Sequence, residues 1–284
     1  MKSIDLIRRV LHEDAGAGDP TSEVLFGPKV RAAAEIRAKA KGVLAGIRVA
    51  EAVFRATDPD VRFRATACDG DRVRQGRVVA RLEGRARSLL KGERLALNYI
   101  CRLSGIATLT HAFVGRIKGT GVLLRHTRKT TPLLRDNELA AVRAGGGSIH
   151  RRSLGDGVLV KDNHLAILGD PALLAPAIRR WRERGFDPMV EVTDERQARA
   201  ALGAGARSLL IDNAKTRVVR RVVAIARSGE FGHVFLEASG GVTLEDVRRI
   251  ARTGVDAISV GRITHSAPAL DFSLEILPPS PARA

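Results

Sequence analysis

Charged and polar side chains recur along the second half of the chain, each close to the end of a short apolar run. The runs lie at residues 122–124, 157–160, 189–192, 208–211, 233–236 and 256–260. The polar residues in or just after them are Thr127, Arg128, Lys129, Lys161, Glu191, Asp212, Ser239, Gly240, Gly241, Ser259 and Gly261. Cations, carboxylates and glycines together are typical of a site that binds a polyanionic small molecule.

The cationic residues predict one half of such a site. Arg128, Lys129, Arg151 and Lys161 bring positive charge, and His150 lies beside them in the sequence. Guanidinium and ammonium groups bind carboxylates and phosphates, so this set suits a substrate with several acidic groups. Taken one at a time, most arginines and lysines are surface cations, and His150 could equally be a buried histidine with satisfied hydrogen bonds.

The acidic and glycine-rich residues predict the other half. Glu191 and Asp212 are carboxylates that can reach a polyphosphate through a bridging Mg2+. The glycines of Ser239-Gly240-Gly241 allow backbone N–H groups to approach a phosphate, and a helix expected from about Thr243 would favour its charge. Gly261 offers a second close approach of the backbone. Either carboxylate could instead be a structural partner of the cations, and a Ser-Gly-Gly sequence is more often a plain turn.

The elements expected between the apolar runs decide between these interpretations. Helical patterns are expected at residues 134–144, 171–184, 194–203, 214–227 and 243–253. Strands that alternate with helices of this length indicate βαβ units and a parallel sheet, and the lack of a GxGxxG sequence favours a barrel over a doubly wound sheet. Side chains at the carboxyl ends of barrel strands meet on one face. We therefore expect the polar residues above to line one cavity.

The first half of the chain has a different pattern. A helix is expected at residues 4–13, strands at 30–38, 61–67 and 78–83, and helices at 86–101 and 105–117. Strands and helices mixed in this way indicate an α+β domain. We place an N-terminal α+β domain at residues 1–112 and an α/β barrel domain at residues 113–284, with a frayed end at 278–281.

Composition limits the class of protein without choosing one. The chain of 284 residues has 48 Lys and Arg against 31 Asp and Glu, a net charge of +17. A nucleic-acid-binding protein is one alternative, but the cations are scattered and aromatic residues, at 4%, offer few stacking platforms. No stretch approaches the roughly 20 apolar residues of a membrane span. Two cysteines without metal-ligand spacing fit a reducing cytoplasm, and we expect no tightly bound metal.

Several sequence blocks occur in a fixed order along nearly the whole chain. They are EDAGAGDPT at 13–21, GVLAG at 42–46, ERLALN at 93–98, LSGIAT at 103–108, TRKTTP at 127–132, GGG at 145–147 with His150-Arg151, KDNH at 161–164, Asp212-Asn213, Ser239-Gly240-Gly241 and GVDAISVG at 254–261. In these blocks the chain resembles the quinolinate phosphoribosyltransferase family, also called the carboxylating nicotinate-nucleotide pyrophosphorylases. So many blocks in one order make the resemblance highly specific.

The resemblance implies a fold, a reaction and an assembly. The family combines an N-terminal α+β domain with an incomplete TIM-like α/β barrel and forms homodimers, sometimes larger assemblies. Its members join quinolinate to phosphoribosyl pyrophosphate in the presence of Mg2+, and they form nicotinate mononucleotide, pyrophosphate and CO2 in NAD biosynthesis. One protomer's N-terminal domain covers the partner's barrel mouth, which would bring Arg94 into the neighbouring site.

Carried over position by position, the resemblance also assigns roles to single residues. Quinolinate would be held by Arg94 of the partner subunit and by Thr127, Arg128, Lys129, His150, Arg151 and Lys161. Phosphoribosyl pyrophosphate would be held by Glu191, Asp212, Ser239, Gly240, Gly241, Ser259, Gly261 and His265. Lys161, Glu191 and Asp212 would be the catalytic residues. Lys161 is our choice for returning a proton to the ring after CO2 leaves.

Two positions depart from the family pattern. The family often reads Thr-Thr-Pro-Gly-Leu-Arg, and Leu133 replaces that glycine. Because leucine disfavours positive φ, we expect the loop after Lys129 to take another path. The family then often has Leu-Glu-Lys, where this chain has Leu139 in place of the lysine. These departures leave open a paralogue that takes a different aromatic acid, although the intact block at 161–164 disfavours the relative associated with molybdenum transport.

Overall fold

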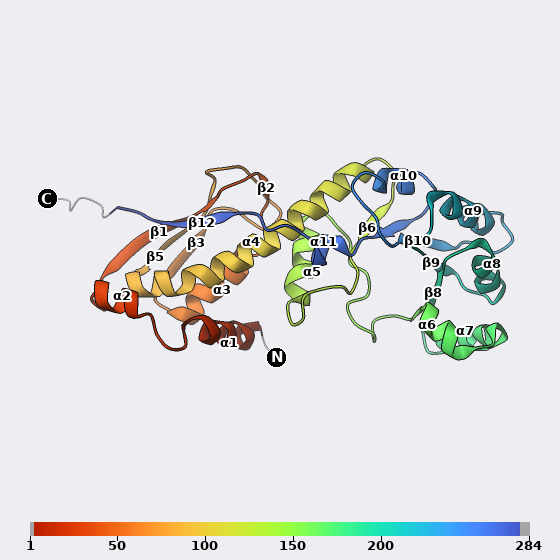
Figure 1. The fold of residues 1–284 in the computed structure, drawn as a ribbon, viewed down its shortest axis with the longest axis horizontal. Helices are drawn as coiled ribbons and strands as arrows, with labels where there is room; N and C mark the ends of the chain where they lie inside the picture. Colours follow the sequence, from red (N-terminus) through yellow and green to blue (C-terminus); the bar gives the residue numbers. More distant parts are fainter. Residues whose placement is uncertain (1–2, 279–284) are drawn as a thin grey trace. The chain divides into compact units, whose positions relative to one another are not determined.

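The structure is a computed structural model that describes residues 3–278 and divides them into two units (Figure 1). The first unit consists of residues 3–111, Leu133–Gly146 and 267–278, and the second of Ala112–Pro132 and Gly147–Ser266. The prediction of one uninterrupted domain over 113–284 is therefore wrong for two segments. The expected frayed end at 278–281 falls almost entirely outside the described residues.

An antiparallel sheet forms the centre of the first unit. Its strand order is β12 (Phe272–Ile276), β1 (Arg31–Ala38), β5 (Val78–Arg85) and β3 (Arg62–Ala65). β5 alternates between buried residues and exposed charged residues from Ala80 to Arg85, as a strand with one covered face does, whereas β1 buries the three consecutive residues 34–36. β12 joins this sheet by pairing with β1, so the end of the chain belongs to the first unit because its backbone completes the sheet. A separate pair is formed by β2 (Gly42–Val43) and β4 (Arg72–Val73).

Five helices accompany these strands. They are α1 (Ser3–Ala15), α2 (Pro20–Leu25), α3 (Ile47–Thr57), α4 (Ala86–Ile117) and α5 (Arg135–Ala144). The prediction of two helices at 86–101 and 105–117 is wrong, because α4 is one continuous helix. Gly105 does not break it; a Cβ at this position would collide with the backbone carbonyl of Pro268. The glycine therefore allows another segment to approach the helix closely rather than ending the helix.

A parallel sheet of six strands forms the centre of the second unit. Its order is β6 (Leu123–Arg125), β11 (Ala257–Ser259), β10 (Phe235–Ser239), β9 (Ser208–Asp212), β8 (Met189–Val192) and β7 (Leu159–Val160). All four residues of β8 are buried, as expected for a strand covered on both faces. Among the described strands, β6 does not pair with β7, so the predicted incomplete barrel is confirmed.

Helices follow most of these strands. They are α6 (Asp162–Leu168), the 3-10 turn η1 (Pro171–Leu173), α7 (Leu174–Glu183), α8 (Glu195–Gly203), α9 (Thr216–Ala226), α10 (Val247–Ala251) and α11 (Arg262–His265). Figure 1 shows α8 and α9 along the outer side of the strands that they connect. Most of the predicted site residues in this unit lie at the carboxyl ends of the strands or in the loops that follow them.

Candidate functional site

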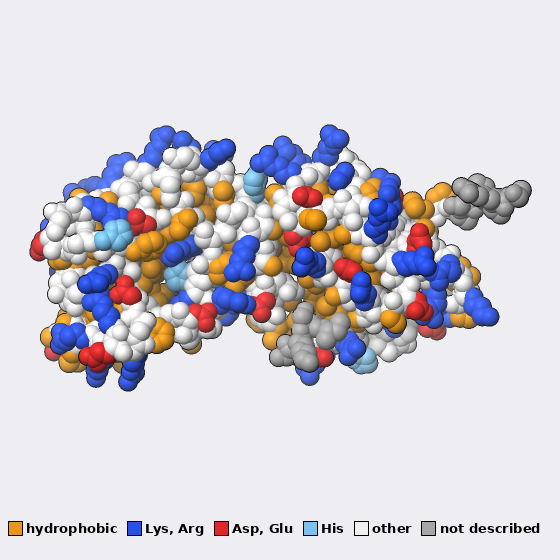
Figure 2. Space-filling view, turned by 180° about the vertical axis from the view of Figure 1, so that it is seen from behind, with side chains coloured by type: hydrophobic (Ala, Val, Ile, Leu, Met, Phe, Trp, Pro, Cys, Tyr) orange, Lys and Arg blue, Asp and Glu red, His pale blue; other side chains and the backbone are white. Residues whose placement is uncertain are grey.

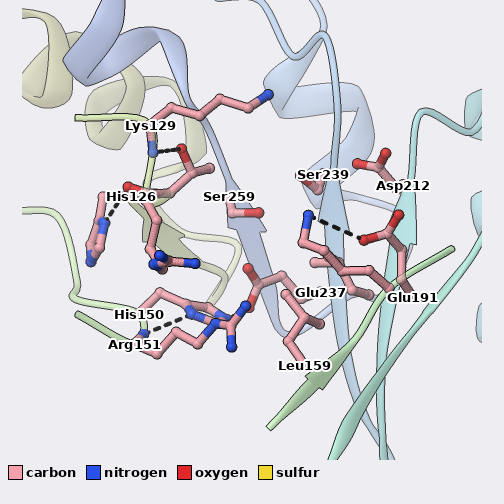
Figure 3. A pocket seen from close by; sticks show the side chains of 14 residues that line it. His126, Lys129, His150, Arg151, Leu159, Glu191, Asp212, Glu237, Ser239 and Ser259 are labelled. Carbon is pink, nitrogen blue, oxygen red and sulfur yellow. Dashed lines mark hydrogen bonds and ion pairs between the residues drawn. The ribbon is translucent and has the colours of Figure 1, made fainter. Parts of the chain in front are cut away.

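The carboxyl ends of the barrel strands surround a cavity of about 300 Å3. It is lined by His126, Thr127, Arg128, Lys129, His150, Arg151, Leu159, Lys161, Glu191, Leu210, Asp212, Glu237, Ser239 and Ser259 (Figure 3). A second cavity of about 330 Å3 is lined by Thr127, Lys129, Ser239, Gly240, Gly241, Val242, Ser259, Val260, Gly261, Arg262, His265 and Ser266. The two adjoin, since four residues line both. Together they contain every predicted site residue except Arg94.

Strand alternation decides which side chains enter the first cavity. Residues two apart on a strand share a face, and Glu237 and Ser239 of β10 both line it. Asp212 at the end of β9 pairs in register with Ser239. Glu191 of β8 pairs in register with Leu210 of β9. Because the strands are parallel, their carboxyl ends present Glu191 and Glu237 at the level of Leu210, and Asp212 and Ser239 two residues further along.

The cations come from the segment after β6 and from the loop before β7. Arg128 and Lys129 follow β6, whereas Arg151 lies in a loop without regular secondary structure. Burial lowers the pKa of Arg151, and the charge of Arg128 lowers it further. Arg151 Nη1 donates to the carbonyl of Gly157 at 3.1 Å, and Thr264 Oγ1 donates to the carbonyl of Lys129 at 2.7 Å. Partly buried guanidinium groups that repel each other favour an anion with more than one acidic group.

A buried carboxylate borders the same cavity. Glu237 is 0% exposed, and its Oε2 accepts a hydrogen bond from Arg125 Nη1 at 2.8 Å. His150 Nε2 lies 3.7 Å from the same oxygen, while His150 Nδ1 accepts from the backbone N–H of Arg151 at 2.7 Å. Burial lowers the pKa of His150, and Glu237 opposes that effect. His150 is therefore a neutral ring near pH 7, and arginine and lysine supply the positive charge of the site.

Glu191 and Asp212 form the acidic side of the cavity. Glu191 is 7% exposed, and Lys161 Nζ lies 3.7 Å from its Oε2 (Figure 3). Burial raises the pKa of Glu191; the charge of Asp212 adds to this effect and that of Lys161 opposes it. A carboxylate in a cleft with a raised pKa and a specific cationic partner is typical of a functional site.

A metal ion on this acidic side would need ligands beyond the protein. Within residues 3–278, no group of three or more His, Cys, Asp or Glu side chains is placed to hold one. Mg2+ commonly binds through one or two carboxylates together with substrate phosphates and water. Glu191 and Asp212 fit that pattern, because they are two carboxylates beside a cavity large enough for a phosphorylated substrate.

The glycines after β10 give the second cavity a backbone wall. Gly240 and Gly241 have φ of 89° and 60°, in the region that favours glycine. A Cβ on Gly240 would lie 2.6 Å from the backbone nitrogen of Asn213, so a larger residue does not fit. Asn213 itself has φ of 50°, and its N–H donates to the carbonyl of Ser239 at 3.0 Å. Because no side chain covers the backbone at these glycines, an anion can approach their N–H groups closely.

The predicted start of the helix near Thr243 is wrong by several residues. The structure begins α10 at Val247, so the glycine segment does not run directly into a helix. Gly261 contributes as expected, since a Cβ there would come within 3.2 Å of the His265 and Lys129 side chains. Backbone N–H groups and these two side chains, rather than a helix N-terminus, are thus available to a phosphate.

Three positions singled out in the sequence lie in the first unit and line neither cavity. Arg94 is exposed on α4. Leu139 is 3% exposed, so this departure from the family lies in the core of that unit. Leu133 has φ of 65° and is 74% exposed. The expectation that leucine would avoid positive φ is wrong, because the turn into α5 keeps this conformation and its side chain projects into free space.

The structure adds residues that the sequence analysis assigned no role. Glu237 and Arg125 form the buried pair described above, and His126 and Leu159 line the cavity. Strand alternation could have found the first two. Glu237 lies two residues before Ser239 on the same strand, and Arg125 lies two residues before Thr127.

Known proteins are similar to this chain along nearly its whole length. Residues 19–104 match the family described as quinolinate phosphoribosyl transferase, N-terminal domain, and residues 106–275 match the corresponding C-terminal domain. The chain is 40% identical over 271 residues to a probable carboxylating nicotinate-nucleotide pyrophosphorylase of Bacillus subtilis, covering 95% of this chain and 92% of that protein. It is 38% identical over 278 residues to the carboxylating nicotinate-nucleotide pyrophosphorylase of Mycobacterium leprae, covering 96% of each. The crystal structure of nicotinate-nucleotide pyrophosphorylase from Ehrlichia chaffeensis matches with a TM-score of 0.89 at 36% identity, covering 96% of this chain and 98% of that one.

Proposed function

Because this chain belongs to the quinolinate phosphoribosyltransferase family, we propose that it converts quinolinate and phosphoribosyl pyrophosphate to nicotinate mononucleotide, pyrophosphate and CO2 in NAD biosynthesis. The observation that carries this proposal is the composition of one cavity. Arg128 lines this cavity, and Figure 3 shows Arg151 toward one side of it and the carboxylates of Glu191 and Asp212 toward the other. Such a cavity suits a dicarboxylic acid next to a phosphorylated sugar.

The cationic side is the proposed quinolinate site. Two carboxylates on adjacent ring carbons need fixed positive groups, and Arg128, Lys129 and Arg151 supply them together with Lys161. Fixed cations orient the ring so that its nitrogen points at the sugar, and positioning of this kind contributes much of the rate in two-substrate reactions. Thr127 and the neutral His150 complete the wall. Arg94 of the partner subunit is proposed to enter from outside.

The acidic side and the glycine-lined cavity are the proposed phosphoribosyl pyrophosphate site. Gly240, Gly241 and Gly261 with Ser239, Ser259 and His265 are placed to hold the 5′-phosphate. Glu191 and Asp212 would face the ribose hydroxyls and share Mg2+ with the pyrophosphate. When bound with this substrate, Mg2+ neutralises charge on the leaving pyrophosphate. Both cavities share Lys129, so one cation borders both substrates.

The proposed chemistry proceeds in two stages. The ring nitrogen attacks the anomeric carbon while the bond between that carbon and pyrophosphate breaks. The positive charge that develops on the sugar is stabilised by Glu191 and Asp212. The nitrogen then carries positive charge, so the ring accepts the electron pair left when the neighbouring carboxylate departs as CO2. That carbon then takes a proton. Lys161 is the proposed donor, because its ammonium lies between the acidic side and the ring site, 3.7 Å from Glu191.

The assembly and location are further proposals. A homodimer, or a larger homo-oligomer built from dimers, is supported by the exposure of Arg94 and its absence from both cavity linings. A cytoplasmic location is supported by two free cysteines. In the part of the chain that the structure describes, no helix has the length and apolar character needed to cross a membrane.

The alternative of a nucleic-acid-binding protein is disfavoured by the distribution of charge. Figure 2 shows lysine and arginine side chains dispersed over the visible face, with acidic side chains among them. A nucleic-acid interface gathers cations on one face or along one helix. The net charge of +17 is therefore spread out rather than focused.

The deciding experiment incubates the purified chain with quinolinate, phosphoribosyl pyrophosphate and Mg2+ and measures nicotinate mononucleotide and CO2. We expect both products in equal amounts, and none when Mg2+ is removed by a chelator. Binding of phosphoribosyl pyrophosphate without product formation would instead indicate a paralogue that uses a different aromatic acid. Binding of duplex DNA that weakens steeply with salt, in place of turnover, would support the nucleic-acid alternative.

A further inference from the structure

Arg151, which the proposed quinolinate site depends on, lies in a loop in which several hydrogen bonds join residues of the loop to one another. Arg151 Nη1 donates to the Gly157 carbonyl at 3.1 Å. The backbone N–H groups of Arg152 and Ser153 donate to Asp156 Oδ2 at 2.8 and 3.0 Å. These bonds shape the loop after Arg151. The start of the loop is attached to β6, since the backbone N–H of Ser148 donates to the carbonyl of Leu124 at 2.7 Å, but this bond lies three residues before Arg151 and does not link Arg151 itself to a strand. A guanidinium that must meet a carboxylate in a defined geometry needs such a link.

His150 provides a link through its two ring nitrogens. Its Nδ1 accepts from the backbone N–H of Arg151 at 2.7 Å, so Nδ1 carries no proton. The single proton of the neutral ring is therefore on Nε2. That nitrogen lies 3.7 Å from Glu237 Oε2, just beyond hydrogen-bond distance, and such contacts often tighten when a substrate binds. His150 thus stands between a loop residue and a strand residue.

Glu237 has acceptor capacity available for this contact. Its side chain is 1% exposed, and Oε2 already accepts from Arg125 Nη1 at 2.8 Å. Oε1 is buried and has no hydrogen-bond partner within the described chain. A buried acceptor that lacks a partner is unfavourable, so the carboxylate is stabilised when it accepts a hydrogen bond from His150 Nε2–H while it keeps the one from Arg125. The strand fixes the backbone of Glu237 by pairing on both sides, with β9 and with β11.

We infer that Glu237 is a positioning residue for the acid-binding side of the cavity, which holds His150 from the barrel strand and, through His150, the backbone of Arg151. This inference rests on the proposed function, because it assigns Arg151 to quinolinate. It makes the length of the Glu237 side chain more important than its charge. Aspartate keeps the charge but withdraws the carboxylate by one methylene, whereas glutamine keeps the length and an acceptor oxygen.

The test compares Glu237→Asp with Glu237→Gln. We expect E237D to raise the KM for quinolinate about tenfold, as loss of one charge-assisted hydrogen bond does. E237Q should raise it less than about threefold, and the KM for phosphoribosyl pyrophosphate should stay within about twofold in both. The matched control is Glu138→Asp, which shortens another fully buried glutamate paired with an arginine, Arg102 Nη2 at 3.0 Å, in the first unit. E138D should leave both KM values unchanged.

A measurement without substrate separates this inference from the proposed function. In protein labelled with 15N-histidine, the ring 15N shifts of His150 should show the single Nε2–H tautomer in the wild type and in E237Q, and a mixture of tautomers in E237D, where the bond from the Arg151 N–H to Nδ1 loosens. Absence of turnover by the wild type would contradict the function and leave this result intact. Near-wild-type KM in E237D together with a tenfold rise in E237Q would overturn the inference, because it would show a role of charge. E237Q preserves shape and so decides the matter even where E237D does not fold.

Discussion

In the first unit, Asp58 is a buried carboxylate surrounded by partners, whereas Glu191 in the second unit is a buried carboxylate with few. Asp58 is 3% exposed and accepts two hydrogen bonds from Arg85 at 2.8 Å each, one from Ser88 Oγ at 2.6 Å and one from the backbone N–H of Asp60 at 3.0 Å. Glu191 is 7% exposed and has Lys161 at 3.7 Å. The pKa values move in opposite directions: the Arg85 hydrogen bonds hold that of Asp58 far below its ordinary value, and burial raises that of Glu191.

The difference separates a structural carboxylate from one arranged for chemistry. Burial of a charge is unfavourable unless hydrogen bonds compensate it, and at Asp58 they do so within the protein. At Glu191 the compensation is incomplete, and Glu237 nearby has an oxygen without a partner among the described residues. Groups left short of partners in a cavity are stabilised when a substrate supplies the missing charges. The second unit therefore holds its carboxylates in a less stable state that a bound substrate can relieve.

The largest effect is expected from Lys161→Ala, which removes the cation that lies 3.7 Å from Glu191. We expect turnover to fall by roughly 100- to 1,000-fold, the range seen when a single electrostatic contact to the reacting groups is lost. The fold should survive because the Lys161 side chain is 49% exposed. Because Lys161 lowers the pKa of Glu191, the acid limb of the residual activity should move to higher pH. Initial rates from pH 4 to 8, with Tm measured alongside, check both effects.

Lys39→Ala is the matched control for that variant. Lys39 is a lysine of similar exposure, 46%, whose Nζ lies 3.5 Å from Glu275 in the first unit. Its removal should leave turnover and the pH profile unchanged. Near-wild-type turnover with quinolinate in K161A would contradict the catalytic role of Lys161 and would reduce Glu191 to another structural carboxylate.

The sequence analysis identified the polar residues of the cavity but not the contacts that these and other residues make with distant segments. Glu191, Asp212 and Lys161 were identifiable because each lies in or just after an apolar run, and parallel strands bring such positions together. The pairing of β12 with β1 was not predictable from local pattern, since it joins residues 272–276 to 34–38. Glu237 was assigned no role because its partners, Arg125 and His150, come from segments far away in the sequence. Whether a buried carboxylate has all its hydrogen-bond partners depends on such contacts between distant segments.

A smaller effect, on stability alone, is expected from Asp58→Asn. Loss of the charge-assisted bonds to Arg85 should destabilise the protein by about 2–3 kcal/mol at pH 7. The folded-state pKa of Asp58 lies below its ordinary value of 3.8, so its stabilisation is present above that pH and is lost as the pH falls toward the folded value. The difference in unfolding free energy between wild type and D58N should therefore be constant from about pH 6 to 8 and shrink below about pH 4. Urea unfolding at several pH values measures it.

Asp60→Asn supplies the control, because Asp60 shares the same arginine but is 73% exposed, at 3.3 Å from Arg85 Nη2. It should change the free energy of unfolding by less than about 1 kcal/mol. Both variants should keep the wild-type kcat and KM for quinolinate. A raised KM in D58N without loss of stability would show that the contrast between the two carboxylates is wrong.

The smallest effect, on stability, is expected from Leu133→Gly, which tests whether the backbone of the first unit is strained at this position. Leu133 has φ of 65°, and an L-residue with a Cβ in this region is disfavoured by about 1–2 kcal/mol. Glycine removes that strain but gains about 0.5–1 kcal/mol of conformational entropy in the unfolded chain, so L133G should be more stable by about 0.5–1 kcal/mol. Leu133→Ala keeps the Cβ and removes a side chain that is 74% exposed, so its stability should match the wild type. Equal stabilisation in both variants would place the effect in the leucine side chain rather than in the backbone, and the strain in this unit would then lie elsewhere.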